Sequence, residues 1–186
     1  MTQEECDKSI ATGERQLIGF WEKSTHYSLA FFFLLFPAVF LCLQLIRDLK
    51  SDPAYSGGNE LWFIAVPLVL SGLTFWMQKR RLRFKIIQTT LTRAQVEAII
   101  ERVADEQEWT GHFVTSKIYK AKTYPGFFSG SWGEEITILL PDDRLFINSI
   151  CDPEKKGSFT SMGRNWENVG MVIKSIKRAE QIVAKG

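Results

Sequence analysis

Histidine and cysteine are scarce in this sequence, which has two histidines and three cysteines among 186 residues. His26 and His112 have no nearby cysteine, serine or aspartate in a catalytic spacing. Cys6, Cys42 and Cys151 are odd in number, far apart, and form no CxxC pair. These absences argue against nucleophilic catalysis, a zinc site and a disulfide framework. We therefore expect reduced thiols in a reducing compartment, no metal, no cofactor and no enzyme activity.

Charged residues are absent from two long apolar runs, Tyr27–Ile46 and Leu61–Gln78. A helix needs about 20 residues to cross a hydrocarbon core of about 30 Å, and backbone groups in lipid must bond within their own segment. Both runs therefore predict transmembrane helices, each with one central proline, Pro37 or Pro67. Because ionisable residues inside a membrane usually mark ion or proton pathways, their absence argues against a transporter formed by this chain alone.

The connector between the runs predicts a helical hairpin. Arg47–Glu60 is short and has turn signals at Asp52–Pro53 and Gly57–Gly58, so both termini should lie on one side of the membrane. Five basic residues follow the second run, and we call them the juxtamembrane basic cluster: Lys79, Arg80, Arg81, Arg83 and Lys85. Because lysine and arginine near a span are retained in the cytoplasm, we expect both termini to be cytoplasmic.

The net charge is only +2, and the part of the chain beyond the basic cluster is balanced. A broad nucleic-acid-binding surface is therefore not expected. The basic cluster could attract anionic lipid headgroups, at about 1 kcal/mol per residue, or it could serve topology alone. The two roles can coexist.

Helix signals occur twice after the hairpin. Thr92 is a good N-cap and Gln95 completes a capping box, so we predict a helix that ends near Trp109, with Gly111 as its stop. A second amphipathic helix should begin near Asn165. Its apolar stripe comprises Val169, Val172, Ile173, Ile176 and Val183.

Strand patterns occupy most of the remaining C-terminal region. Phe84–Thr90 is predicted as a strand, or else as a continuation of the second membrane helix. Further strands are expected at His112–Tyr124, Glu135–Leu140 and Leu145–Ile150, the last two as a hairpin, with a short edge strand at Ser158–Met162. The fold class is therefore α+β, a two-helix transmembrane hairpin followed by a small antiparallel sheet packed by two helices. The expected organisation is an N-terminal segment (1–26), the hairpin (27–78) and a cytoplasmic domain (79–186).

A polar stretch before the last helix is the candidate binding site. Lys155, Lys156, Ser161, Arg164 and Asn165 cluster before or at a helix start, where free N–H groups attract anions. They could bind a phosphate or a lipid headgroup together with the juxtamembrane basic cluster, or Asn165 could simply cap the helix. The acidic pairs Glu134–Glu135 and Asp142–Asp143 are expected to be solvated carboxylates near a hairpin tip.

The motifs INSICDP (Ile147–Pro153) and SMGRNWENV (Ser161–Val169) resemble a pattern in small uncharacterised bacterial two-span membrane proteins. With GSWGEEITILL (Gly130–Leu140), they also resemble more distantly a bacterial domain-of-unknown-function family with a curved antiparallel sheet. The chain differs from that family at Cys151–Asp152, where a basic residue is expected. The resemblance implies a bacterial inner-membrane location and no activity.

Three functions are consistent with these features. The first is a non-enzymatic membrane protein whose cytoplasmic domain binds a protein partner or a second copy of the chain. The second is a module that binds anionic lipid or phosphate at the inner leaflet. The third is an enzyme acting on a lipid-linked substrate. The missing catalytic set favours the first.

Overall fold

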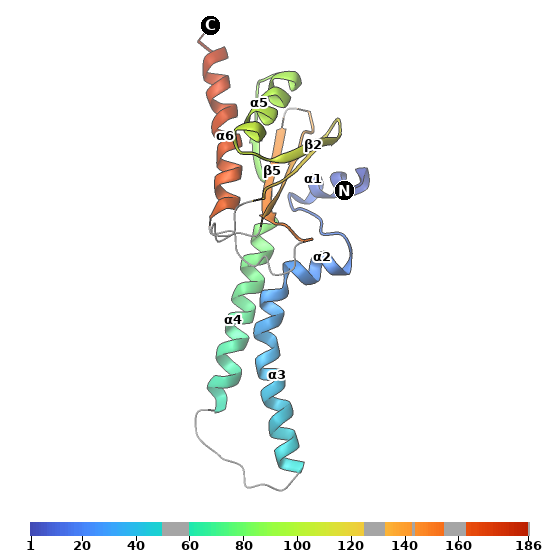
Figure 1. Cartoon of the computed structure of the whole chain (residues 1–186), viewed down its shortest axis with the longest axis vertical. Helices are drawn as coiled ribbons and strands as arrows, with labels where there is room; N and C mark the ends of the chain where they lie inside the picture. Colours follow the sequence, from blue (N-terminus) through green and yellow to red (C-terminus); the bar gives the residue numbers. More distant parts are fainter. Residues whose placement is uncertain (50–59, 125–132, 143, 155–162, 186) are drawn as a thin grey trace. The chain divides into compact units, whose positions relative to one another are not determined.

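The computed structural model describes residues 1–49, 60–124, 133–142, 144–154 and 163–185. The chain divides into two compact units (Figure 1). One comprises His26–Arg80, and the other joins Met1–Thr25 to Arg81–Gly186. The predicted connector positions 50–59, the edge strand Ser158–Met162 and most of the polar stretch before it lie outside the described residues.

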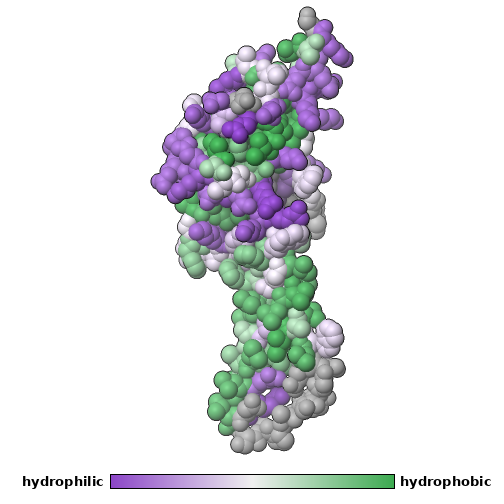
Figure 2. Space-filling view, turned by 180° about the vertical axis from the view of Figure 1, so that it is seen from behind, coloured by the Kyte–Doolittle hydropathy of each residue, from purple (hydrophilic) through white to green (hydrophobic). Residues whose placement is uncertain are grey.

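The smaller unit contains the two predicted apolar helices, α3 (Ser28–Leu49) and α4 (Glu60–Arg81). Both are long and apolar enough to cross a membrane by length and composition. Only 11% of the most apolar part of α3 and 6% of that of α4 is buried, whereas the core helix of a soluble protein would be mostly buried. Hydrophobic residues dominate the face of these helices that Figure 2 presents. The two helices are therefore candidate membrane spans.

Polar and aromatic contacts join α3 to α4. The Ser71 hydroxyl donates a hydrogen bond of 2.9 Å to the backbone oxygen of Ala30, which is buried. The Tyr27 and Phe75 rings stack with their centroids 4.8 Å apart. An apolar medium offers the Ser71 hydroxyl no hydrogen-bond partner. Its bond to the Ala30 oxygen therefore stabilises the pairing of the two helices.

The larger unit is built on an antiparallel five-stranded sheet with the order β1-β5-β4-β3-β2, which confirms the α+β class. The strands are β1 (Lys85–Gln88), β2 (Thr110–Thr115), β3 (Ile118–Lys122), β4 (Glu134–Leu139) and β5 (Arg144–Cys151). The segment after α4 is thus a strand rather than a continued helix. The predicted β4–β5 hairpin is confirmed.

Two helices follow the predicted signals. Helix α5 (Arg93–Glu106) begins with the predicted Thr92–Gln95 capping box. Helix α6 (Arg164–Val183) begins one residue before the predicted start. Val172 and Ile176 of its apolar stripe are fully buried, but Val183 in the last turn is 58% exposed. The stripe therefore packs over most of the helix but not at its end.

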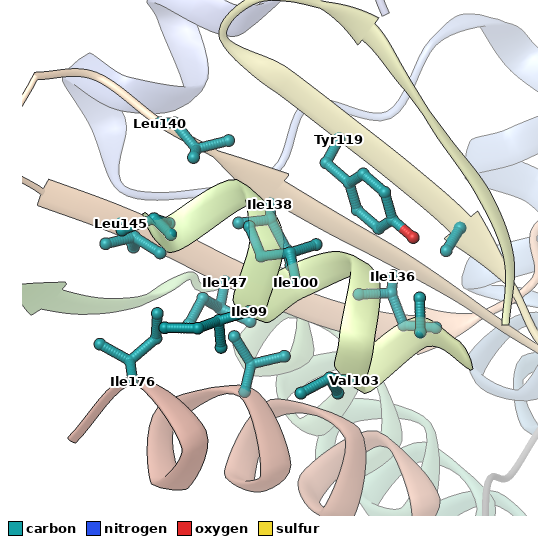
Figure 3. Packing of buried hydrophobic residues seen from close by; sticks show 14 of the residues in the cluster. Ile99, Ile100, Val103, Tyr119, Ile136, Ile138, Leu140, Leu145, Ile147 and Ile176 are labelled. Atoms are coloured by element: carbon teal, nitrogen blue, oxygen red, sulfur yellow. The ribbon is translucent and has the colours of Figure 1, made fainter. Parts of the chain in front are cut away.

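One face of the sheet carries the main core, to which α5 and α6 contribute. Ile99, Ile100 and Val103 of α5 gather there with strand residues and with Ile176 of α6 (Figure 3). The strand residues in this cluster include Tyr119, Ile136, Ile138, Leu145 and Ile147. Alternate residues of β4 thus face these helices, as the pleat of a strand requires.

The N-terminal segment covers the other face of the sheet, and its helices were not predicted. Helix α1 (Gln3–Thr12) has a capping box between Thr2 and Glu5, and α2 spans Gly19–His26. Cys6 of α1 is fully buried in a second cluster with strand and flanking residues. These are Phe84, Ile118, Leu139 and Phe146. Backbone hydrogen bonds from Arg15 N–H to the Leu82 oxygen and from Phe84 N–H to the Gly13 oxygen hold the segment in place.

The prediction of one strand over His112–Tyr124 is wrong, because this segment forms the β2–β3 hairpin. The Thr115 hydroxyl accepts the Lys117 N–H at 3.2 Å in the turn, and the register shifts between Phe113 and Thr115. The predicted helix stop at Gly111 is also wrong. Helix α5 ends at Glu106, and Gly111 lies within β2 opposite Ala121.

Gly111 allows β2 to approach the core side of β3. A Cβ atom at this position would lie 2.5 Å from the Tyr119 hydroxyl oxygen and 2.6 Å from the Ala121 Cβ. Gly111→Ala should therefore lower the free energy of unfolding by about 1–3 kcal/mol, the usual cost of overpacking. Gly170→Ala in α6 is the control, because an added Cβ there meets nothing within 4 Å and should stabilise the helix by about 0.5–1 kcal/mol. Urea unfolding of the two variants measures both; equal midpoints would contradict the packing argument.

Candidate functional site

The juxtamembrane basic cluster has several separate roles in the structure. The Arg80 guanidinium lies 4.6 Å from the centre of the Trp76 ring, and Lys79 is exposed at the end of α4. The Arg83 side chain pairs with Glu14 at 3.4 Å. Lys85 is exposed at the start of β1. Part of the cluster's charge is thus already engaged within the chain.

Asn148 holds the backbone of the same cluster. Its side-chain Nδ2 donates to the backbone oxygens of Arg81 at 2.9 Å and Arg83 at 3.1 Å. Asn148 is itself buried, and its two bonds hold the backbone of residues 81–83 to β5. This structural role was not predicted.

Only part of the predicted polar site can be located. Lys155, Lys156 and Ser161 lie outside the described residues, whereas Arg164 and Asn165 occupy the first turn of α6. The alternative prediction, that Asn165 caps this helix, is wrong. The N-cap is Gly163, with φ of 93° and no side-chain cap bond, and the Asn165 Oδ1 instead accepts the Ser149 hydroxyl at 2.9 Å.

A cleft of about 280 Å³ adjoins this helix start. Trp109, which is 7% exposed, and Arg164 both line it, as do the side chains of Glu108 and Glu167. Within the described chain, Arg164 makes no ion pair or hydrogen bond, so its guanidinium is available for a carboxylate or phosphate. The two carboxylates offset its charge, so the cleft as a whole is not electropositive.

A second, more open hollow of about 470 Å³ lies along α6. Its lining comprises Gly170, Ile173, Lys174, Lys177, Arg178 and Gln181. Trp166 precedes Gly170 by one helical turn and is 85% exposed. We call these seven residues the outer face of α6. Lys177 and Arg178 follow Lys174 by three and four residues, a spacing that could have revealed this face in the sequence.

A buried charge cluster lies on the sheet face that α1 covers. Arg15 pairs with Glu135 at 2.6 Å, and both side chains are about 95% buried. Lys120 also reaches Glu135, at 2.8 Å. Lys122 on the same strand pairs with Asp152 at 3.4 Å and with Glu154. Through Glu135, the cluster ties the N-terminal segment to β4 and β3.

The expectation of solvated carboxylates at Glu134–Glu135 is wrong, because both are buried. Glu134 accepts the Thr123 hydroxyl, and its own N–H donates to that oxygen at 2.8 Å. Asp142 is exposed, and Asp143 lies outside the described residues. A signal for the burial of Glu135 was the alternation of Lys120 and Lys122 with apolar residues in β3, and the register sets Lys122 opposite Glu135.

The charges around Glu135 determine its protonation. Burial raises the pKa of Glu135, but the attraction of Arg15, Lys120 and Lys122 outweighs burial and holds that pKa below its ordinary value. Burial likewise raises the pKa of the Cys6 thiol. Glu135 is therefore a charged carboxylate at neutral pH, with a structural rather than an acid–base arrangement of partners.

Among the described residues there is no candidate metal site, because no group of three or more His, Cys, Asp or Glu side chains could hold an ion there. His26 instead lies 2.9 Å from the backbone oxygen of Gln78. No family model matches the chain, and no curated protein matches its sequence. The resemblance to the bacterial two-span proteins therefore stays an expectation.

Proposed function

We propose that this chain is a non-enzymatic integral membrane protein that presents its α+β unit in the cytoplasm for interaction with another protein. The observation that carries the proposal is the outer face of α6. It combines an exposed tryptophan with three cations that have no ion-pair partner among the described residues. Tryptophan and arginine are enriched at protein interfaces, and this face carries one of each, Trp166 and Arg178.

The charges inside the unit support a non-enzymatic role. Glu135 is shared by Arg15 and Lys120, and Glu134 is bonded to Thr123, so the buried carboxylates have structural partners. A general acid or base would instead face a reacting group in a cleft. We therefore assign Glu134 and Glu135 a role in stability rather than in catalysis.

The orientation follows from the juxtamembrane basic cluster, because positive residues beside a span are retained in the cytoplasm. Protease added outside intact cells should leave the region beyond residue 90 uncut, and permeabilised cells should show cleavage there. Cleavage from outside would contradict the proposed inner-membrane orientation with cytoplasmic termini.

The interaction itself can be tested by photo-crosslinking the full chain in its native membrane. A photoreactive residue at position 177, on the outer face of α6, should yield a discrete crosslinked protein. The same residue at position 102, which is exposed on α5, is the matched control and should not yield it. If neither position, nor any other exposed position of the larger unit, crosslinks a protein, the proposed function is wrong.

A second candidate function is binding of anionic lipid or phosphate at the inner leaflet. Arg164 favours it, because it is half-buried in the cleft and has no ion-pair partner among the described residues. Inorganic phosphate added to the full chain should then shift the NMR signal of the Trp109 indole N–H, and Arg164→Gln should abolish the shift. An unmoved signal in the unaltered chain would remove this candidate.

A further inference from the structure

We infer that the outer face of α6 binds an acidic helical segment of a different protein, with an apolar side chain of that segment seated over Gly170. This inference rests on the proposed function and names the partner's chemistry. It depends on three features of α6 that no contact among the described residues accounts for.

The first feature is that α6 has two faces with different uses. Val172 and Ile176 are fully buried in the core, and Asn168 bonds to Ser149. Positions 170, 174, 177 and 181 fall on the opposite side because an α-helix repeats every 3.6 residues. Gly170, Lys174, Lys177 and Gln181 are all exposed there, so the sheet leaves this side open.

The second feature is uncompensated charge. Lys174, Lys177 and Arg178 make no ion pair with any residue that the structure describes. The nearest acidic residue along the helix, Glu180, accepts the Thr90 N–H at 3.1 Å. Cations near a helix C-terminus can simply complement the macrodipole, but that effect fades within the last turn. Lys174 and Lys177 precede the last turn of a helix that ends at Val183, so the macrodipole does not account for them.

The third feature is the glycine itself. Glycine destabilises a helix interior relative to alanine, and Gly170 lies well inside α6. A Cβ atom at this position would meet nothing within 4 Å, so no contact in the described chain requires glycine. Its missing side chain leaves the helix backbone uncovered one turn after Trp166 and one turn before Lys174. Close approach of another chain is the physical use of such a position.

Together these features favour an acidic helix over a membrane surface. A lipid surface is broad and needs only positive charge, whereas the outer face of α6 places an exposed tryptophan one turn from an exposed glycine, beside three cations. An amphipathic helix can lay an apolar anchor in a groove while its flanking residues contact the rim. Three cations on that rim select aspartate and glutamate on the partner.

The test uses the full chain in nanodiscs of neutral lipid and two synthetic helical peptides. One peptide carries glutamates on both sides of a leucine row, and the other carries glutamines at the same positions. The acidic peptide should shift the Trp166 indole signal and bind at least about tenfold more tightly than the glutamine peptide, with binding that weakens as salt rises. Equal binding of the two peptides would overturn the inference.

Substitutions on the outer face of α6 provide a second test of the inference. Lys174→Glu with Lys177→Glu should lower the affinity for the acidic peptide about tenfold, and Gly170→Leu should lower it by filling the hollow. Arg102→Glu on α5 is the control and should bind like the unaltered chain. A urea midpoint no lower than that of the unaltered chain shows that each variant is folded; if the double variant unfolds, Lys177→Glu and Gly170→Leu carry the test. Unchanged peptide affinity in folded outer-face variants would overturn the inference.

The crosslink at position 177 separates this inference from the proposed function. A crosslinked protein that disappears in Lys174→Glu with Lys177→Glu supports both. A crosslinked protein that persists in those variants leaves the proposed function standing and overturns the acidic-helix inference. Crosslinks to lipid alone, or to a second copy of the chain, overturn it as well.

Discussion

Glu135→Ala should lower the free energy of unfolding of the larger unit by about 3–5 kcal/mol, the usual cost of removing one partner of a buried ion pair. The substitution leaves the Arg15 guanidinium about 95% buried without its carboxylate. Its Nη1 has no hydrogen-bond partner in the described structure, and Glu135 is the carboxylate with which Arg15 pairs there. Pulse proteolysis across a urea series measures the change for the solubilised full chain.

A matched control and a double variant make the result specific. Glu97→Ala breaks an ion pair of 2.7 Å on the exposed side of α5 and should cost about 0.5 kcal/mol or less. Arg15→Met combined with Glu135→Leu removes both buried charges and should recover most of the stability that Glu135→Ala loses. A loss below about 1 kcal/mol in Glu135→Ala would show that water reaches Arg15 and that the pair is not buried as described.

The same pair should make the unit sensitive to acid. The pKa of Glu135 in the folded protein lies below the ordinary value of 4.5, so the unfolded chain binds a proton at higher pH than the folded chain does. The stabilising contribution is therefore present above that ordinary value and is lost as the pH falls through the lower folded pKa. Stability of the unaltered chain should fall more steeply below pH 4.5 than stability of the Arg15→Met, Glu135→Leu variant.

Replacing residues 1–17 with a glycine–serine segment of equal length should destabilise the larger unit by at least about 3 kcal/mol. The replacement removes Arg15 from Glu135 and also uncovers the sheet face on which Cys6 packs. Hydrogen exchange of β3 and β4 should accelerate, because their second face becomes accessible to water. Hydrogen-exchange mass spectrometry on the full chain reports this for each strand.

The control keeps α1 but alters only its exposed side. Gln3, Asp7 and Ala11 are exposed, and changing all three to serine should shift stability by about 0.5 kcal/mol or less per site. Unaltered exchange in β3 and β4 after the glycine–serine replacement would mean that α1 does not protect the sheet. A fragment that starts at residue 79 lacks this cover, so binding experiments need the full chain.

Features that depend on neighbouring residues could be predicted from the sequence. The length and apolarity of α3 and α4, the capping box of α5 and the β4–β5 hairpin all depend on interactions within a few turns or across one turn. The α+β class followed from the order of these elements. The predicted boundaries near Gly111 and within His112–Tyr124 were wrong, because close packing of Gly111 on Tyr119 and the turn between Thr115 and Ile118 are set by strand pairing rather than by local propensity.

The candidate sites likewise combine features that the sequence predicts with features that only the folded structure shows. The charge and spacing of Lys174, Lys177 and Arg178 can be read from the sequence, but that they form no ion pair with the described residues is a property of the folded unit. The burial of Glu135 depends on Arg15, which lies 120 residues away along the chain. Short-range periodicity determined where the chain is apolar and which segments are helices and strands. Only the tertiary structure decided that the first 25 residues pack with the C-terminal sheet. Contacts between segments so far apart form only when folding brings their charges and apolar surfaces together, and no local sequence pattern predicts them.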